Sequence, residues 1–402
     1  MKKYLYEAKD GASGKLVKST VQADSESAAA KLLISQGFVP LRIDLESDRA
    51  GIFTKLAERI TSKDRIVFSR QLATLISAGL PLSQSLRTVQ EQTASKGMQS
   101  VIQDIIVDIE GGRTLTEAFS KHPQVFDRVF ISLVSAGEAS GTLDDALKRI
   151  SAQQEKDEAM MRKIRGALTY PIIVLVVILG VIIFMLTTVV PQVEGLYKDL
   201  GKSLPFLTQM MVNTANFLIS YWFFVLIGMT IAGYFLIQYT KTESGARNVD
   251  IFKLNVPIFS RMFRKLYMAR FTRTGQTLLS TGVAMLDMLN ITSGAVNNRV
   301  IGDTIQRSAE KVKGGKSLSS SLKGEDYILD MVPHMISIGE QSGKIDEMMG
   351  KCAQIYEDEL DEEIKNISTA IEPVLMVVLA IVAGGMVGAI LFPIYGLVNN
   401  LL

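Results

Sequence analysis

Uncharged apolar stretches interrupt an otherwise polar chain of 402 residues at three places. Residues 170–190, 217–237 and 373–395 contain no Asp, Glu, Lys or Arg. Each is close to the roughly 20 residues that an α-helix needs to cross the hydrocarbon core of a bilayer. A buried helix of a soluble protein with this length would normally carry a polar stripe. The pattern therefore predicts three transmembrane helices.

Basic residues beside these stretches predict their orientation. Residues 240–275, after the second stretch, hold eight Lys and Arg against two acids, and residues 162–165, before the first, hold three more. The loop over residues 191–216 has two lysines and two acids. Because Lys and Arg concentrate on the cytoplasmic side of a membrane, we expect both large polar regions to be cytoplasmic. The loop and the uncharged tail over residues 396–402 are then external.

The start of the chain does not have the pattern of a signal peptide. The charged residues Glu7, Lys9 and Asp10 stand where a signal peptide needs an apolar run. We therefore expect the N-terminus to be cytoplasmic.

The chain contains an internal duplication. Residues 68–79 (FSRQLATLISAG) reappear at residues 271–282 as FTRTGQTLLSTG, 203 positions later. Residues 111–115 and 314–318 are related by the same offset. A conserved register over a whole domain indicates a repeat rather than chance similarity. Three further pairs are related by an offset of 202. They are residues 137–141 and 339–343, Pro171 and Pro373, and Pro191 and Pro393.

Each copy is a polar region that leads directly into a membrane span. Apolar residues there recur at helical spacing, which predicts small α-helical bundles. Residues 1–60 instead alternate like strands around one alanine-rich helix, which predicts a small α/β appendage. The predicted fold is mainly α, with duplicated cytoplasmic helical bundles joined to three transmembrane helices. The expected divisions are 1–60 (α/β region), 61–169 (first bundle), 170–190 (span), 191–216 (loop), 217–237 (span), 238–371 (second bundle), 372–395 (span) and 396–402 (tail).

Two short glycine–glutamate turns occur at equivalent places in the copies. Their glycines suit the end of one helix and the start of the next. Their glutamates could cap a helix, pair with a basic residue of the same bundle, or contact a partner. Because the turns are kept in both copies, we hypothesise that they belong to a cytosolic docking surface. The residues concerned are Gly137, Glu138 and Gly141 in the first copy and Gly339, Glu340 and Gly343 in the second.

Prolines and small residues mark features of the spans. Pro171 and Pro373 stand where the cytosolic helices enter the membrane, and a proline inside a helix removes a hydrogen bond and bends the axis. They are candidate hinges, with a static kink or a helix start as the alternative. Ala380, Gly384 and Gly388 recur at a spacing of four, which gives the third span a face suited to close helix packing.

Two other segments have simple interpretations. The acidic run over residues 357–363 is expected to be a solvated helix face, with contact to a basic partner surface as the alternative. Residues 315–317 (GKS) resemble the end of a phosphate-binding loop, but Glu310 stands where that pattern requires glycine. In the first copy, Thr114 and Glu117 predict a capping box at a helix start.

Composition argues against several classes of function. A net charge of +2 is too small for a protein that grips a nucleic acid backbone. One cysteine, Cys352, and two histidines, His122 and His334, are a poor stock for a metal site. The sequence shows no constellation of catalytic groups, so we expect no enzymatic activity, no cofactor and no metal. The spans also lack the charged residues that usually mark a transport pathway.

Taken together, the chain resembles the F-type platform family, the inner-membrane proteins of type II secretion systems and their type IV pilus counterparts. The resemblance covers nearly the whole chain. The second copy is looser, because Thr274-Gly275-Gln276 stands where the first has Gln71-Leu72-Ala73. The matching elements are residues 68–82, 137–141, 339–343, Tyr170-Pro171, Glu372-Pro373 and the N-terminal stretches 6–10 and 37–40.

The resemblance implies two cytoplasmic six-helix domains, three spans and self-association in the cytoplasmic (inner) membrane. It also implies contacts with a cytosolic assembly ATPase, with pilin or pseudopilin subunits and with other membrane components of the machine. The expected function is that of a non-catalytic platform of type IV pilus biogenesis, which couples the ATPase to extraction and polymerisation of pilins. The alternatives are the equivalent platform of a type II secretion system or a membrane transporter subunit.

Overall fold

The computed structural model describes residues 2–10, 16–23, 26–35, 37–45, 60–199 and 206–398. The N-terminal unit consists of β1 (Lys2–Asp10), β2 (Leu16–Ala23), α1 (Glu26–Ser35) and β3 (Phe38–Leu45). Its antiparallel sheet has the order β2-β1-β3, with Tyr6 of β1 opposite Ser19 and Ile43. Tyr6, Ala8 and Leu33 are buried and pack with Phe38. A small α/β unit is therefore present, as the alternation of residues predicted.

The first helical bundle is built around a cluster of phenylalanine rings. Phe68, Phe119, Phe126 and Phe130 are buried, and the ring centroids of Phe119 and Phe126 are 4.5 Å apart. Burial of large aromatic side chains is the main stabilising contribution that such a small bundle can make. Its helices are α3 (Ser62–Ser77), α4 (Leu82–Gln92), α5 (Lys96–Glu110), α6 (Leu115–Ser120), α7 (Arg128–Ser140) and the first part of α8 (Leu143–Phe184).

The second bundle repeats the first helix by helix. Most helices start 203 positions after their counterparts, and the one-residue loss falls within α16, which has 12 residues where α7 has 13. Gly79 and Gly282, which follow the first helix of each bundle, have φ of 84° and 85°. The helices are α12 (Ser260–Ser280), α13 (Met285–Ala295), α14 (Arg299–Lys313), α15 (Leu318–Leu322), α16 (Met331–Ser342) and the first part of α17 (Ile345–Val398), preceded by α11 (Glu243–Asn255).

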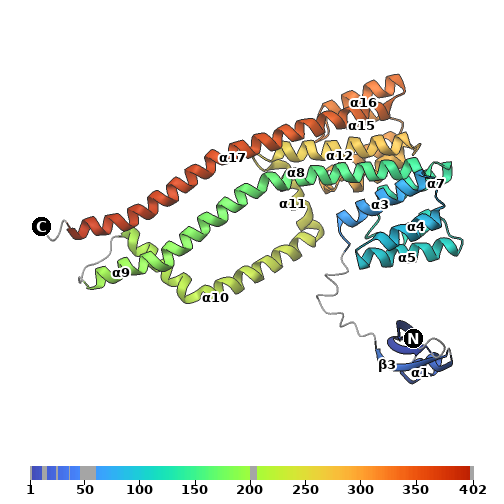
Figure 1. The fold of residues 1–402 in the computed structure, drawn as a ribbon. Helices are drawn as coiled ribbons and strands as arrows, with labels where there is room; N and C mark the ends of the chain where they lie inside the picture. The colour runs from blue at the N-terminus through green and yellow to red at the C-terminus, as the bar shows by residue number, and fades with distance from the viewer. Residues whose placement is uncertain are drawn as a thin grey trace.

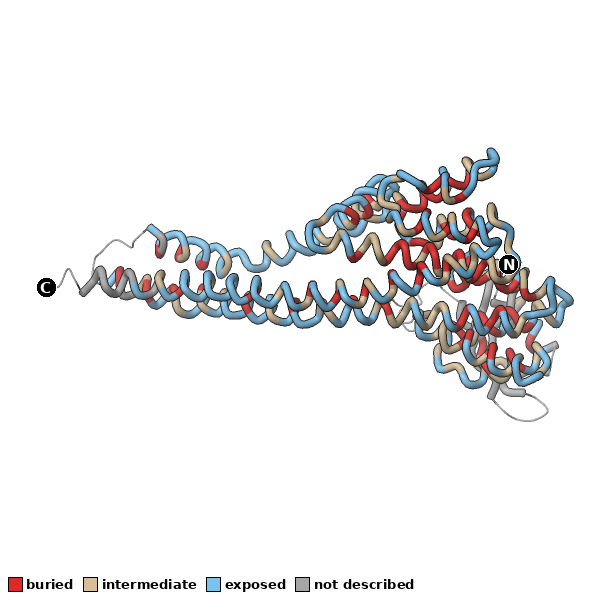
Figure 2. Tube along the Cα trace, turned by 90° about the horizontal axis from the view of Figure 1, so that it is seen from above, coloured by how far each residue is buried: buried red, intermediate tan, exposed pale blue. Residues whose placement is uncertain are grey.

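Three helices of the described chain are long and apolar enough to cross a membrane. The first continues from α8 through a π-helical turn (Met185–Val189) into α9 (Val190–Asp199), the second is α10 (Phe206–Lys241), and the third is the end of α17. Pro191, which has no N–H for the helical ladder, lies just after this π-turn. Buried residues gather in the bundles, whereas the spans are mostly exposed (Figures 1 and 2). This exposure is expected where lipid replaces protein neighbours.

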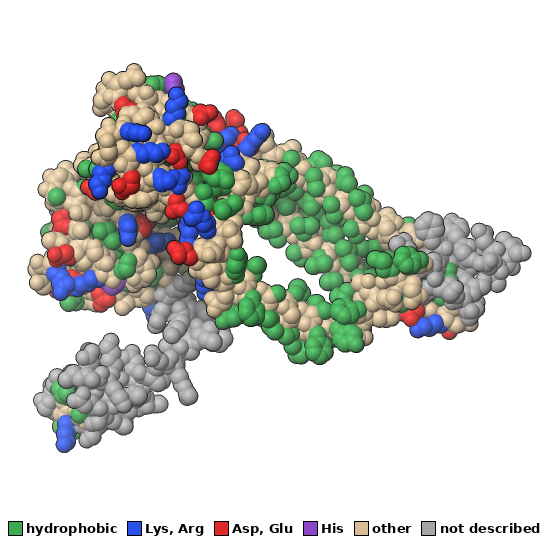
Figure 3. All heavy atoms as spheres, turned by 180° about the vertical axis from the view of Figure 1, so that it is seen from behind, with side chains coloured by type: hydrophobic (Ala, Val, Ile, Leu, Met, Phe, Trp, Pro, Cys, Tyr) green, Lys and Arg blue, Asp and Glu red, His purple; other side chains and the backbone are tan. Residues whose placement is uncertain are grey.

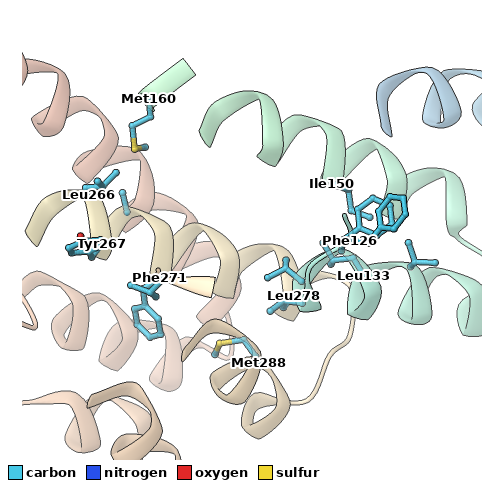
Figure 4. Close-up of a cluster of buried hydrophobic side chains, with 14 of the residues drawn as sticks. Phe126, Leu133, Ile150, Met160, Leu266, Tyr267, Phe271, Leu278 and Met288 are labelled. Atoms are coloured by element: carbon cyan, nitrogen blue, oxygen red, sulfur yellow. The ribbon is translucent and has the colours of Figure 1, made fainter. Parts of the chain in front are cut away.

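The two bundles share one continuous apolar core. Phe126, Leu133 and Ile150 of the first bundle belong to the same buried cluster as Leu278 and Met288 of the second (Figure 4). Loss of water from both surfaces therefore stabilises the contact between the bundles as well as each bundle itself. The two copies form one compact part at one end of α8 and α17 (Figure 1).

Candidate functional site

The first glycine–glutamate turn is fixed by contacts with two neighbouring helices. Gly137 lets α7 approach α8, because a Cβ at that position would lie 2.6 Å from the Cβ of Ala146. Glu138 accepts hydrogen bonds from the backbone N–H groups of Leu115 and Thr116, at 2.8 and 3.0 Å, and from the Thr116 hydroxyl. Gly141 ends α7 with φ of 72°, a conformation that favours glycine.

The second turn repeats this arrangement. A Cβ on Gly339 would lie 2.7 Å from the Cα of Ile345, so glycine permits the approach of α16 to α17. Glu340 accepts hydrogen bonds from the N–H groups of Leu318 and Ser319, at 2.6 and 3.2 Å. Gly343 ends α16 with φ of 71°. The duplication therefore preserves a three-helix contact and not only a sequence pattern.

Each glutamate caps the short helix of its bundle. Glu138 reaches the free N–H groups at the start of α6, where a negative charge is favourable. Burial acts to raise the pKa of Glu138, but the hydrogen bonds from Thr116 and Leu115 outweigh it, so the pKa lies below its ordinary value. Of the roles considered for the turns, capping is present in the structure. Docking of a partner stays a prediction, and both turns lie at the end of the bundles farthest from the C-terminus (Figure 1).

The sequence predicted a solvated helix face for the acidic run over residues 357–363, but several of its acids pair with basic residues of the same chain. Glu357 forms a bidentate ion pair with Arg273 of α12, with N–O distances of 2.7 and 2.8 Å, and both side chains are about 15% exposed. Lys156 of α8 approaches the same carboxylate at 3.5 Å. The basic surface that this run contacts belongs to the chain itself.

Three further ion pairs extend this contact along α17. Lys163 of α8 pairs with Asp361, and Lys265 of α12 pairs with Glu359 and Glu363 at 3.0 and 2.9 Å. The acids of α17 thus hold α8 and α12 together just before the spans begin. We call Lys156, Lys163, Lys265, Arg273 and the acids that they pair with the ion-pair joint.

The central pair of the joint has a counterpart in the first bundle. Arg70 lies 3.3 Å from Glu155, and these residues are equivalent by the repeat to Arg273 and Glu357. The first pair is 59% and 43% exposed, whereas the second is enclosed. Exposed pairs contribute little to stability, while breaking an enclosed pair leaves an uncompensated charge. The two equivalent ion pairs are therefore expected to contribute differently to the stability of their bundles.

A cavity of about 750 Å³ lies between the bundles. Residues from α3, α7, α8, α12 and α13 line it, among them Arg65, Asp157 and Arg270. Polar contacts cross between the bundles near it: Gln153 donates to the Thr274 hydroxyl at 2.9 Å. The interface between the bundles therefore combines a shared apolar core with a polar cavity at one side.

Asp157 is the most perturbed acid in this interface. Burial raises its pKa to about 6, and the neighbouring charges of Asp127 and Glu357 act in the same direction. Arg270 and Arg273 act against this rise and do not cancel it. The acid is therefore close to half ionised near pH 6.

The proline and small-residue candidates lie apart from these contacts. Pro171 is buried inside α8 and Pro373 is exposed inside α17, and each helix continues through its proline. A hinge at either position stays a prediction. Ala380 and Gly384 are exposed and Gly388 is half-buried, so the small-residue face is largely open in the described chain. No atom lies within 4 Å of a Cβ built on Gly384.

The loops considered for chemistry have structural roles. Thr114 and Glu117 form the predicted capping box of α6, and Ser317 caps the five-residue helix α15. Cys352 is buried, which raises its pKa to about 12 and makes its thiol unreactive. Within the described ranges, no three His, Cys, Asp or Glu side chains are grouped so as to hold a metal ion.

Sequence reasoning missed the ion-pair joint and Asp157. The repeat did align Arg70 with Arg273 and Glu155 with Glu357, so a search for oppositely charged pairs kept in both copies would have suggested the pair. Nothing local distinguishes Asp157 from its charged neighbours Lys156 and Glu158. Its burial depends on a second bundle more than a hundred positions away.

Family comparison accounts for the duplication. The family model described as type II secretion system protein F matches residues 68–191 and again residues 271–393. A second model, the N-terminal domain of the same protein, matches residues 1–44. Together the two models cover most of the chain in the order that the fold shows.

Several characterised proteins are similar over nearly their full length. The type IV pilus assembly protein PilC of Thermus thermophilus is 36% identical over 99% of this chain and 98% of its own. PilC of Myxococcus xanthus is 37% identical over 98% of this chain and 94% of its own. The type II secretion system protein F of Aeromonas hydrophila is 31% identical over 94% of this chain and 98% of its own.

The environment of Asp157 predicts a pH-dependent stability. The folded pKa of about 6 lies above the ordinary value of 3.8, so between about pH 4 and 6 the folded state binds more protons than the unfolded state. Stability then falls as the pH rises through that window and stays lower above it. Asp157→Asn should remove this cost and stabilise the protein by up to about 3 kcal/mol at pH 8, with a smaller gain at pH 5.

Thermal unfolding of the full chain in detergent at both pH values measures this difference. Asp145→Asn, at an exposed acid of the same helix, is the matched control and should change little at either pH. An equal effect of Asp157→Asn at pH 5 and pH 8 would contradict the assigned pKa.

Proposed function

Because the chain belongs to the type II secretion system protein F family, we propose that it is the platform protein of a type IV pilus assembly machine in the cytoplasmic membrane. It couples a cytosolic assembly ATPase to the extraction of pilin subunits from the membrane and their polymerisation. It catalyses no reaction itself. The observation that carries the proposal is the pair of long helices that connect the cytosolic bundles to the spans without a break.

Similarity favours a pilus over a secretion system. Relatives named for type IV pilus assembly are 34 to 37% identical to the chain. Relatives named for type II secretion are 29 to 31% identical. The second candidate function is therefore the equivalent platform of a type II secretion system, in which the subunits would be pseudopilins.

The two long helices give a mechanical route between the ATPase and the pilin. The helical rod from Leu143 to Asp199 has 57 residues, which corresponds to about 85 Å at 1.5 Å per residue. α17 is a second rod beside it, and the ion-pair joint connects the two above the membrane (Figure 1). Displacement of the bundles would thus move both spans. Pro171 and Pro373 are the places where each rod would bend.

The end of the bundles farthest from the C-terminus, where the two glycine–glutamate turns lie, is the proposed docking surface for the ATPase. Gly137, Glu138 and Gly141 and their counterparts Gly339, Glu340 and Gly343 hold this surface in shape. Ala139 and Gln341, the central residues of the two turns, are exposed and would make the contact. The small-residue face of α17, with Ala380, Gly384 and Gly388, would pack against a second copy of the chain or against a pilin helix. Other membrane components of the machine would surround the spans.

The proposed orientation places both bundles and the N-terminus in the cytoplasm and the C-terminus outside. The distribution of Lys and Arg beside the spans supports it. Cys352 is buried and unreactive, so the natural chain provides a silent background for cysteine labelling.

Labelling of intact spheroplasts with an impermeant maleimide tests the orientation. Gln192→Cys, in α9 just after the first span, should be modified from outside, whereas Ala94→Cys, in the first bundle, should react only after permeabilisation. Both positions are exposed, so accessibility of the side chain does not differ. The reverse pattern would invert the proposed topology.

Deletion of the gene in the native host tests the function. Surface filaments should disappear while pilin accumulates in the membrane, and complementation should restore the filaments in electron micrographs. Loss of a set of secreted proteins with filaments intact would favour the secretion platform. If neither changes, the assembly function is wrong.

Adding charge to the exposed residues of the turns tests docking without breaking the caps. Ala139→Glu and Gln341→Glu should weaken co-purification of the ATPase by about tenfold, as expected for central residues of an interface. Gln124→Glu, an exposed position of the first bundle away from the turn, is the matched control. Equal co-purification of all three variants would place the docking surface elsewhere.

Substitution of the capping glutamate gives a different result. Glu138→Ala removes the acceptor of two backbone donors, which should lower stability by about 1–3 kcal/mol. Loss of binding by that variant would therefore not separate docking from folding.

A further inference from the structure

One helix, α11, connects the second span to the second bundle. α11 follows α10 after a single residue, Thr242, whose hydroxyl caps it by accepting from the N–H of Gly245. The turn is tight, since a Cβ on Gly245 would lie 1.9 Å from the carbonyl oxygen of Tyr239. α11 is therefore held at the end of the second span. In Figure 1 it runs across the common direction of α8 and α17.

One face of α11 is occupied by the bundle. Asp250 and Leu254 are buried, and the Asp250 carboxylate accepts the backbone N–H of Arg299 at the start of α14. Arg247 of α11 also pairs with Asp303 of α14, at 3.2 Å. These contacts fix the rotation of α11 about its axis, and so they determine which residues lie on the other face.

The opposite face carries large exposed apolar side chains, with the polar Asn248 and Asn255 beside them. Ile251 is 38% exposed and Phe252 is 66% exposed, and Ile258, in the turn to α12, is 61% exposed. Ile258 has φ of 74°, an unusual conformation for a β-branched residue. A soluble surface rarely groups large exposed apolar side chains in this way without a partner.

A hydrogen bond shows that this face points to the side of the span. Asn248 lies on the same face of α11 as Ile251 and Phe252 by helical periodicity. Its side-chain amide donates to the hydroxyl of Tyr239 of α10 at 2.8 Å. Most bundle contacts lie on the other side, and at the end of the helix the Asn255 amide donates to the Tyr327 hydroxyl of the second bundle at 3.3 Å. The exposed apolar residues therefore face the region where α10 enters the bilayer.

Charged residues flank the apolar face. Lys241 ends α10 and Arg261 begins α12, and both are exposed. Glu243, in the first turn of α11, is the exposed acid beside them. Exposed hydrophobic residues between basic ones are the pattern of a helix that lies at the boundary between headgroups and acyl chains. Hydrophobic side chains cover the adjoining spans, whereas charges gather over the bundles (Figure 3).

We propose that α11 and the turn that follows it lie on the surface of the bilayer that α10 crosses, with Ile251, Phe252 and Ile258 inserted at the acyl-chain boundary and Lys241 and Arg261 among the lipid phosphates. The inference requires α10 to span the membrane and does not depend on the pilus function. The second bundle is then anchored to the membrane along its side.

Tryptophan fluorescence in lipid nanodiscs tests the proposal on the full chain. The chain has one tryptophan, Trp222, which lies in α10 and reports on the span. In a Trp222→Phe background, Phe252→Trp reports on α11, and Val107→Trp reports on an exposed apolar position of the first bundle. Ile251→Trp is the second reporter on the same face if Phe252→Trp does not purify.

The expected result is that brominated phospholipids quench Phe252→Trp by a loss comparable to that of native Trp222. Val107→Trp should keep its emission with brominated lipid and lose it with acrylamide. If Phe252→Trp instead behaves like Val107→Trp, the proposal is overturned, but the assignment of α10 as a membrane span is not affected. Protection from both quenchers would mean that protein covers α11, which also overturns it. Failure of brominated lipid to quench Trp222 would reject the span and the proposal together.

Discussion

The carboxylate of Glu357 is the contact on which the arrangement of the helices depends. This carboxylate is largely enclosed, so its negative charge needs a positive partner. Arg273 of its own bundle and Lys156 of the other bundle provide the positive charges. A shift of α8 along α17 would separate Lys156 from its partner and would also disturb the neighbouring Lys163–Asp361 pair. The charges therefore fix the register of the two rods, while the shared apolar core supplies the cohesion.

Duplication produced two similar bundles with different mechanical surroundings. The first is preceded by the α/β unit and keeps its Arg70–Glu155 pair at the surface. The second is preceded by α11 and encloses the equivalent pair. In both, a glycine and a glutamate connect the last short helices to a rod.

Much of the fold could be predicted from the sequence because it rests on local rules. The spans follow from length and absence of charge, since an uncharged run of this length has few other stable environments. The repeat offset aligns helix starts such as Leu82 with Met285 and Leu115 with Leu318. The capping box of Thr114 and Glu117 and the left-handed conformation of Gly141 are also local, because each depends on residues within one helical turn.

Only the tertiary structure decided what the charged residues do. Glu138 caps a helix that starts 23 positions earlier, the acids near Glu357 pair with α8 and α12, and Asp157 owes its raised pKa to enclosure between bundles. Helical periodicity shows which residues share a face, but not what covers that face. The energy of a charge depends on the solvent and the partners around it. Contacts between segments far apart in the chain determine that solvent exposure and those partners, and the sequence alone does not show which segments come together.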